Sequence, residues 1–144
     1  MANVGCLSKC EAALGVLLLT AGGLLYVLYR PMETLLIRLM GWIGMDTCLD
    51  RWREAAAAVT PPEWVVYSLP AGLWAMSYVL IVDALTAGSK MTYKGRLAAV
   101  SIVPLLGMTS ELLQAAGLVP GTFDWLDLGF YLLPLTLLSF DFRT

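Results

Sequence analysis

The chain has 144 residues, of which 59% are hydrophobic and only 14% are charged, and its formal net charge is −2. Soluble domains carry about 25% charged residues, so this composition excludes an ordinary soluble domain and indicates a polytopic membrane protein. The net charge is negative and no basic cluster is interleaved with aromatic residues, so the pattern of a nucleic-acid-binding surface is absent. Histidine is absent, so a Ser–His or Cys–His nucleophile is excluded and we expect no metal ion or cofactor.

Four apolar windows approach the roughly 20 helical residues that cross a hydrocarbon core of about 30 Å. They cover residues 12–28, 64–85, 97–118 and 125–142. The first follows Lys9 and lacks a small-residue cleavage site after it, so we interpret it as a retained signal anchor. We therefore predict a single all-α membrane domain over residues 1–144, a bundle of four transmembrane helices.

The first loop, residues 30–63, is too long to be structureless in a compact protein. Its first half carries apolar residues at helical spacing, which predicts an amphipathic helix at the membrane interface. These residues are Leu35, Leu36, Leu39, Trp42 and Ile43. A second short helix should start near Asp50 and stop before Pro61. Together the two helices predict a collar over the ends of the spans, and the alternative is a plain linker that rests on lipid.

Orientation follows from the basic residues of the short loops. The connection 86–96 carries three cations and no acid, whereas the connection 118–123 carries neither. The cationic loop should be cytoplasmic, which puts both termini in the cytoplasm and residues 30–63 on the extracytoplasmic side. The arginines of residues 30–63 argue the other way, but acidic residues are mixed with them. Near the cytoplasmic end of the second span, Asp83 predicts an ion pair with Lys90, Lys94 or Arg96.

Polar residues interrupt the last two apolar windows at helical spacing. Gly107, Glu111 and Gln114 share one helix face of the third span, and a matching stripe opens the fourth. The intervening turn is tight, so these spans should be antiparallel neighbours. At 1.5 Å per residue, Glu111 lies about 10 Å below Leu118, close in depth to the start of the fourth span.

We therefore predict a polar pocket near the extracytoplasmic face, to which the second span contributes an aromatic face. The candidate ligand-binding residues are Glu111, Gln114, Asp124, Asp127, Tyr67, Trp74 and Tyr131. Asp124 and Asp127 also have a structural interpretation, because acids in a first helical turn cap free N–H groups and interact favourably with the helix dipole. Glu111 lies inside its span and needs a partner: Gln114, a backbone carbonyl or an arginine of the first loop.

The stretch Glu111-Leu112-Leu113-Gln114, followed by Pro120-Gly121-Thr122-Phe123-Asp124-Trp125-Leu126-Asp127, resembles the signature of VanZ-like membrane proteins. The segment from Tyr67 to Trp74 is similar to their second-span motif, so the resemblance covers residues 64–134. The chain departs from the pattern where the family commonly has an arginine, an asparagine and a glycine. Here those places hold Gly121, Tyr131 and Pro134. The resemblance implies an envelope protein of the bacterial inner membrane, with a link to glycopeptide resistance of the teicoplanin type.

Three functions remain open from the sequence. The first is binding of a membrane lipid or a lipid-linked small molecule in the polar pocket. The second is a carboxylate-dependent membrane hydrolase, whose catalytic residues the sequence does not identify. The third is an accessory or pore-forming subunit that acts as a homo-oligomer or with a partner membrane protein. Without an evident nucleophile or phosphate-binding loop, the sequence favours the binding protein.

Overall fold

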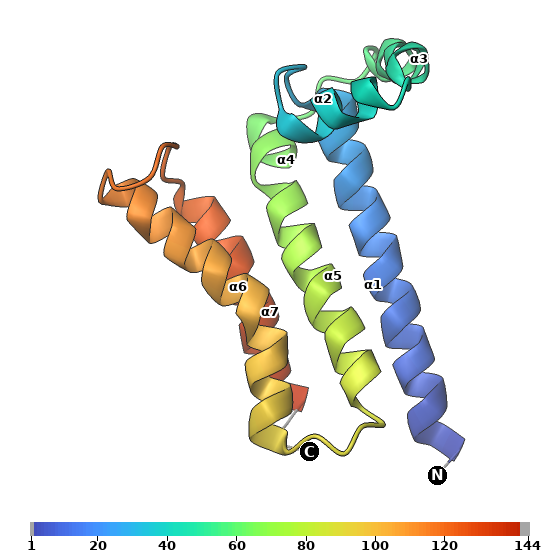
Figure 1. Cartoon of the computed structure of the whole chain (residues 1–144), viewed down its shortest axis with the longest axis vertical. Helices are drawn as coiled ribbons and strands as arrows, with labels where there is room; N and C mark the ends of the chain where they lie inside the picture. Colours follow the sequence, from blue (N-terminus) through green and yellow to red (C-terminus); the bar gives the residue numbers. More distant parts are fainter. Residues whose placement is uncertain (1, 142–144) are drawn as a thin grey trace.

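Helices joined by short connections form the whole described structure (Figure 1). The structure is a computed structural model that describes the backbone of residues 2–141 and the side chains of residues 6–137. In chain order the helices are α1 (Ala2–Tyr29), α2 (Leu35–Trp42), α3 (Asp46–Ala56), α4 (Glu63–Tyr67), α5 (Leu69–Thr86), α6 (Tyr93–Ala115) and α7 (Trp125–Asp141). No strand occurs within residues 2–141, so the predicted all-α class is confirmed.

Three of these helices are long and apolar enough to cross a membrane: Cys6–Tyr29, Leu69–Thr86 and Tyr93–Ala115. The helix α7 lies beside α6 and runs in the opposite direction (Figure 1), but its apolar described stretch, Trp125–Leu137, is shorter. The structure therefore supports a membrane helical bundle with three spans, and the predicted fourth span stays a prediction. Phe142, the predicted last residue of that span, lies outside the described residues.

Glycines bring the long helices close together. A Cβ on Gly15 or Gly22 of α1 would lie 2.7 Å or 2.8 Å from side-chain atoms of Ile81 or Trp74 on α5. A Cβ on Gly72 of α5 would lie 2.7 Å from the ring of Phe130 on α7. Lipid tails are as apolar as the helix surfaces, so the hydrophobic effect does not drive helices together inside a membrane. Close approach at glycines instead strengthens the van der Waals packing between helices. The α1–α5 pair is the most extensive packing in the described chain.

The second apolar window is not one continuous helix. It divides into α4 and α5 at Ser68, whose φ and ψ are −101° and −40°. Pro70 is the physical reason, because it has no N–H to donate to the carbonyl of Val66. Across this break, Tyr67 and Trp74 still lie against the same side of α1: Tyr67 contacts Arg30, and Trp74 contacts Tyr26.

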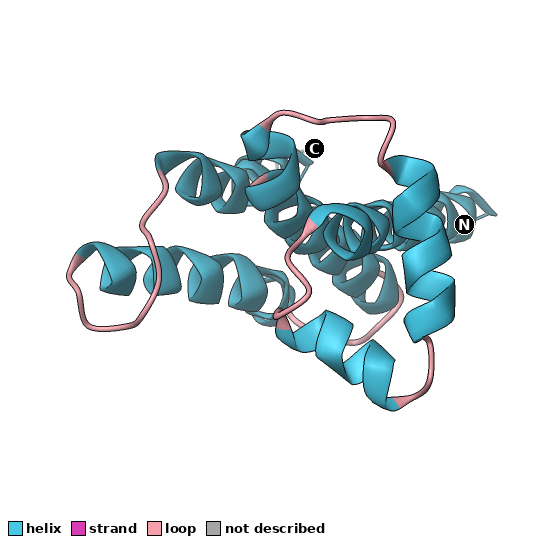
Figure 2. Ribbon diagram, turned by 90° about the horizontal axis from the view of Figure 1, so that it is seen from above, coloured by secondary structure: helices cyan, strands magenta, loops and turns pink. Residues whose placement is uncertain are grey.

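The predicted collar exists, and it covers the end of α1. Ile37 of α2 and Leu49 of α3 form a buried cluster with Val27 of α1. Arg53 of α3 donates from Nε to the carbonyls of Val27 and Leu28, at 3.0 and 3.2 Å, and so satisfies carbonyls of the last turn of α1. Figures 1 and 2 show α2 and α3 across the ends of α1 and α4 and away from the α6–α7 turn.

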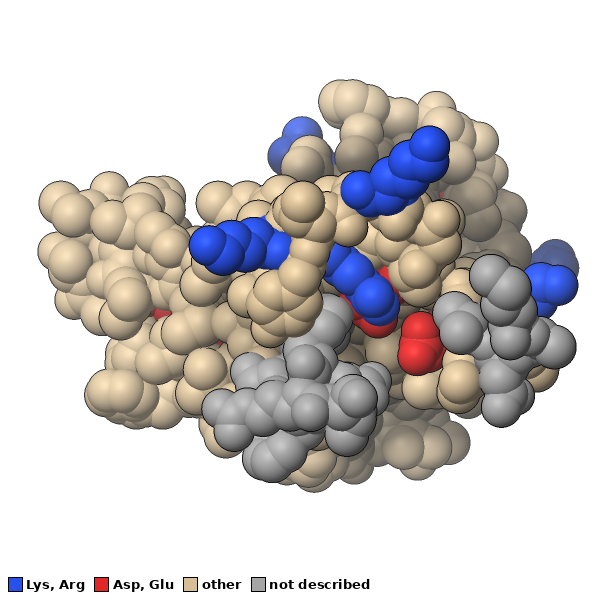
Figure 3. Space-filling model, turned by 90° about the horizontal axis from the view of Figure 1, so that it is seen from below, with Lys and Arg blue, Asp and Glu red and all other residues tan. Residues whose placement is uncertain are grey.

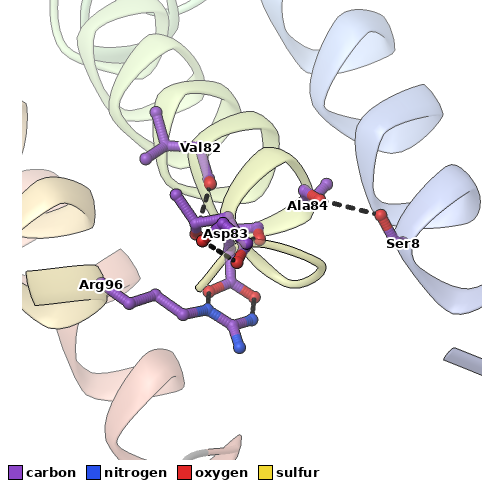
Figure 4. Close-up of polar contacts among 7 residues, drawn as sticks. Ser8, Val82, Asp83, Ala84 and Arg96 are labelled. Atoms are coloured by element: carbon purple, nitrogen blue, oxygen red, sulfur yellow. Dashed lines mark hydrogen bonds and ion pairs between the residues drawn. The ribbon is translucent and has the colours of Figure 1, made fainter. Parts of the chain in front are cut away.

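At the other end of the bundle, an ion pair joins α5 to α6. Arg96 donates from Nε to Oδ1 of Asp83 at 2.7 Å and from Nη2 to Oδ2 at 2.5 Å (Figure 4). Close by, the hydroxyl of Ser8 donates to the carbonyl of Ala84 at 2.9 Å and ties α1 to the same end of α5. The predicted ion pair of Asp83 is confirmed, with Arg96 as the partner.

We expect Gly72→Ala to destabilise the protein. The new Cβ would lie 2.9 Å from Cβ and Cγ of Phe130, atoms that cannot move without shifting α7, and such overpacking costs about 1–3 kcal/mol. Thermal unfolding in detergent measures the effect. Gly23→Ala is the matched control, since a Cβ there meets nothing within 4 Å and helix propensity favours alanine. Equal melting temperatures for the two variants would contradict this packing.

We expect Asp83→Ala to lower the free energy of unfolding by roughly 2–3 kcal/mol, because the half-buried guanidinium of Arg96 loses a bidentate carboxylate. The double variant Asp83→Ala, Arg96→Leu should recover part of this loss, since it leaves no unpaired charge. Lys90→Ala, in the exposed α5–α6 connection, serves as the control. A double variant less stable than Asp83→Ala alone would show that the ion pair is not what makes Asp83 important.

Candidate functional site

A polar cavity of about 520 Å³ lies at the end of the bundle where α1 ends and α7 begins. Its walls come from the residue after α1, from α4 and its junction with α5, and from the start of α7. The lining residues are Arg30, Glu63, Trp64, Tyr67, Ser68, Thr122, Asp124, Leu126 and Asp127. One guanidinium and three carboxyl groups in one cavity make it the candidate site for a polar or charged ligand.

Arg30 forms one wall of the cavity and is held by aromatic rings. It follows the last residue of α1, and its Nη2 donates to the carbonyl of Tyr67 at 2.8 Å. Its guanidinium carbon lies 5.3 Å from the ring centroid of Tyr26 and 4.7 Å from that of Tyr67, within the range of cation–π attraction. Because of these contacts, Arg30 is fixed beside the cavity.

The two aspartates of α7 form the opposite wall. Asp124 precedes the helix and caps it, because its Oδ1 accepts a hydrogen bond from the N–H of Leu126 at 2.8 Å. Its Oδ2 accepts from the hydroxyl of Ser68 at 3.4 Å, which connects α7 to the α4–α5 junction. Asp127 lies one turn further along, beside Ser68 and Asp124 and within the electrostatic reach of Arg30. The predicted capping role of Asp124 is confirmed.

Glu111 lies directly behind this wall. Only 6% of the residue is exposed, and its Oε2 accepts a hydrogen bond from the backbone N–H of Asp124 at 3.2 Å. Its partner is thus a backbone N–H, and not Gln114, a backbone carbonyl or an arginine of the first loop as expected. The three acids of α6 and α7 therefore converge as expected, but only Asp124 and Asp127 face the cavity.

The structure brings together only part of the predicted set of residues. Tyr67 lines the cavity with the two aspartates, and Tyr131 lies behind them with Glu111, its ring against Gly107. Gln114 donates to Ser110, one turn earlier in α6, at 3.3 Å, and its side chain lies against Gly121 of the α6–α7 turn. That turn needs Gly121, since its φ is +146° and an added Cβ would lie 2.5 Å from Oε1 of Gln114.

Trp74 packs on Tyr26, with ring centroids 5.2 Å apart, outside the cavity.

Several lining residues were not predicted from the sequence. They are Arg30, Glu63, Trp64, Ser68, Thr122 and Leu126. Arg30 had a local signal, because it follows Tyr26 by four residues at the end of an apolar span, where the two side chains share a helix face. Its contact with Tyr67 crosses 37 residues of sequence, so only the tertiary fold reveals it.

Two atoms of this cavity are buried without a hydrogen-bond partner: Nε of Arg30 and Oδ1 of Asp127. Within the side chains that the structure describes, no other buried nitrogen or oxygen atom is left unpartnered. In the same part of the chain, no group of three or more acids, cysteines or histidines is arranged to hold a metal ion. The unpartnered atoms lie on one cation and one acid of the cavity, so its lining offers charged groups of both signs.

No family model, curated protein or solved structure matches this chain. The assignment of a function therefore rests on the residues and their geometry.

We expect Asp124→Ala to lower the free energy of unfolding by about 1 kcal/mol, because the first turn of α7 loses the side chain that caps it. Asp124→Asn should remain close to the parent protein, since asparagine caps a helix as well as aspartate does. Thermal unfolding of the purified protein in detergent measures both variants. If alanine and asparagine proved equally stable at this position, the cap would not contribute to folding.

Proposed function

We propose that this protein is a membrane protein that binds the polar headgroup of an amphiphile, either a lipid or a lipid-linked envelope component, in the cavity between Arg30 and Asp127. The observation that carries the proposal is the concentration of unpartnered buried polar atoms on these two residues. Each such atom costs about 1–3 kcal/mol, and native structures keep few of them. Both residues line the cavity, so a ligand there would lie beside these incompletely satisfied groups.

The position of the cavity supports a ligand that remains partly in lipid. The cavity lies at one end of the long apolar helices, level with the end of α1. Exposed apolar side chains flank it: Trp64 is 48% exposed, Leu126 51% and Trp125 75%. Tryptophan favours the membrane–water interface. An amphiphile could therefore keep its chains in the bilayer while its headgroup enters the cavity.

In the proposed topology the cavity faces the outside of the bacterial inner membrane. The opposite face of the bundle displays lysine and arginine side chains (Figure 3), and the α5–α6 connection contributes exposed Lys90 and Lys94. Basic residues in short loops favour the cytoplasmic side. With α7 as a fourth span, both termini are then cytoplasmic, and the collar of α2 and α3 lies outside.

The VanZ-like resemblance suggests a biological setting for this binding. The residues that carry the resemblance include Glu111, Asp124 and Asp127, which converge beside the cavity. The turn has Gly121 where the family commonly has an arginine, and here a cation reaches the cavity from Arg30 instead. We extend the proposal to an envelope role in which the bound amphiphile is linked to resistance against lipid-bearing glycopeptides of the teicoplanin type.

We expect the parent protein to retain lipid from its membrane during purification, and the double variant Arg30→Ala, Asp127→Ala to bind that lipid at least about tenfold more weakly. Loss of two charge-assisted hydrogen bonds accounts for the change. Native mass spectrometry of protein in detergent, titrated with the extracted lipid, measures the bound fraction.

The matched control for this titration is Asp50→Ala, Arg51→Ala, which removes one acid and one cation from exposed positions of α3 outside the cavity. It should bind as the parent does. Circular dichroism and size-exclusion chromatography check that each variant is folded. If the folded cavity variant retained lipid with unchanged affinity, the proposed function would be wrong.

A further inference from the structure

The opposite charges of the cavity are kept apart. No nitrogen of Arg30 lies within 4.0 Å of a carboxylate oxygen of the described residues, although Asp127 lies within the electrostatic reach of Arg30. At the other end of the bundle, Arg96 and Asp83 form a closed bidentate pair. A closed pair gains more Coulomb energy than a separated one. The separation in the cavity therefore leaves both charges available to a third group.

The cavity is lined by more acidic than basic residues, and this excess determines which charge on a ligand is favourable. Arg30 is the one cation among its lining residues, and it faces Glu63, Asp124 and Asp127. Glu111 adds a fourth carboxyl group directly behind Asp124. A headgroup with only negative charge would meet several carboxylates for one guanidinium, which is unfavourable. An ammonium group is attracted to the same wall.

The hydrogen-bonding atoms of the cavity also form two groups: a donor on Arg30 and acceptors on the carboxylates. On Arg30, Nη2 is bonded to Tyr67 and Nε is buried, whereas Nη1 forms no hydrogen bond with a described residue and can donate to an anionic oxygen. Among the lining acids, Glu63 is exposed and Asp127 is only half-buried, so their carboxylates can accept from an ammonium group. The ring of Trp64 also lines the cavity, whereas the ring of Tyr67 already lies against the guanidinium of Arg30.

We infer that the headgroup is zwitterionic, with a primary ammonium group directed at Asp127 and Glu63 and a phosphate or similar anion directed at Nη1 of Arg30. This inference rests on the proposed function and names the class of its ligand: an amphiphile of the aminophospholipid type. A quaternary ammonium group has no N–H to donate, so it loses the hydrogen bonds to the carboxylates. A purely anionic headgroup gains nothing from the acidic wall.

The test titrates the purified protein in detergent with short-chain phosphatidylethanolamine, phosphatidylcholine and phosphatidylglycerol, and measures the bound fraction by native mass spectrometry. Phosphatidylethanolamine should bind about tenfold more tightly than the other two, which corresponds to one charge-assisted hydrogen bond. Asp127→Asn should reduce this preference by weakening phosphatidylethanolamine more than the other two lipids. Arg30→Gln should weaken all three lipids alike, since each carries a phosphate. Asp50→Asn, on the exposed surface of α3, should change nothing.

Different outcomes overturn different parts of the inference. Preferential binding of phosphatidylglycerol that is lost in Arg30→Gln would overturn the zwitterionic headgroup and keep the proposed function. Lipid binding that no cavity variant changes would overturn both. Free phosphoethanolamine bound as tightly as the short-chain lipid would show that the ligand is a soluble zwitterion and not an amphiphile. If Asp127→Asn does not fold, Glu63→Gln on exposed α4 replaces it and must reduce the same preference.

Discussion

The cost of placing a charge in an apolar bundle governs this structure. Each charge at the centre of a span costs roughly 2.5–3.5 kcal/mol even on insertion scales, so charged side chains are confined to the ends of the helices, where they need partners. At one end the requirement is met by the compact pair of Asp83 and Arg96. At the other end each charged side chain has separate partners. Arg30 contacts aromatic rings and donates to a carbonyl, and Asp124 accepts from a backbone N–H and a hydroxyl group. One carboxylate oxygen of Asp127 has no hydrogen-bond partner. The first end is thereby closed, and the second retains a charged cavity.

The local structure around the cavity follows from a few backbone features. Pro70 breaks the second apolar segment and lets α4 turn the face of Tyr67 towards the end of α1. Arg53 donates to carbonyls in the last turn of α1, so these carbonyls have partners although the helix ends before Arg30. Asp124 starts α7 beside Ser68. Each feature satisfies or removes a backbone hydrogen bond at a helix end, which is necessary in a protein with little water around it. The cavity is formed where these ends meet.

The sequence predicted the parts of the structure that depend on local pattern. Apolar windows located the long helices, the spacing of Leu35 to Ile43 located α2, and the proximity of a lone acid to a cationic loop located the ion pair of Asp83. The convergence of α6 and α7 followed from helical spacing and a short turn. What failed depended on geometry between distant segments. Tyr67 lines the cavity but Trp74 does not, and the side chain of Gln114 lies against Gly121. Arg30 reaches the cavity through a contact with Tyr67, 37 residues away. Periodicity contains no information on such contacts.

The start of α7 explains why the anion of a zwitterion must go to Arg30. A helix N-terminus normally attracts anions, because its free N–H groups and its dipole present positive charge. Here the protein supplies its own anions to that place: the carboxylate of Glu111 accepts from the N–H of Asp124, and the side chain of Asp124 accepts from that of Leu126. A phosphate that approached this helix start would meet both carboxylates at close range, which is unfavourable. The unused guanidinium donor lies across the cavity, so the positive and negative parts of a ligand are directed to opposite walls.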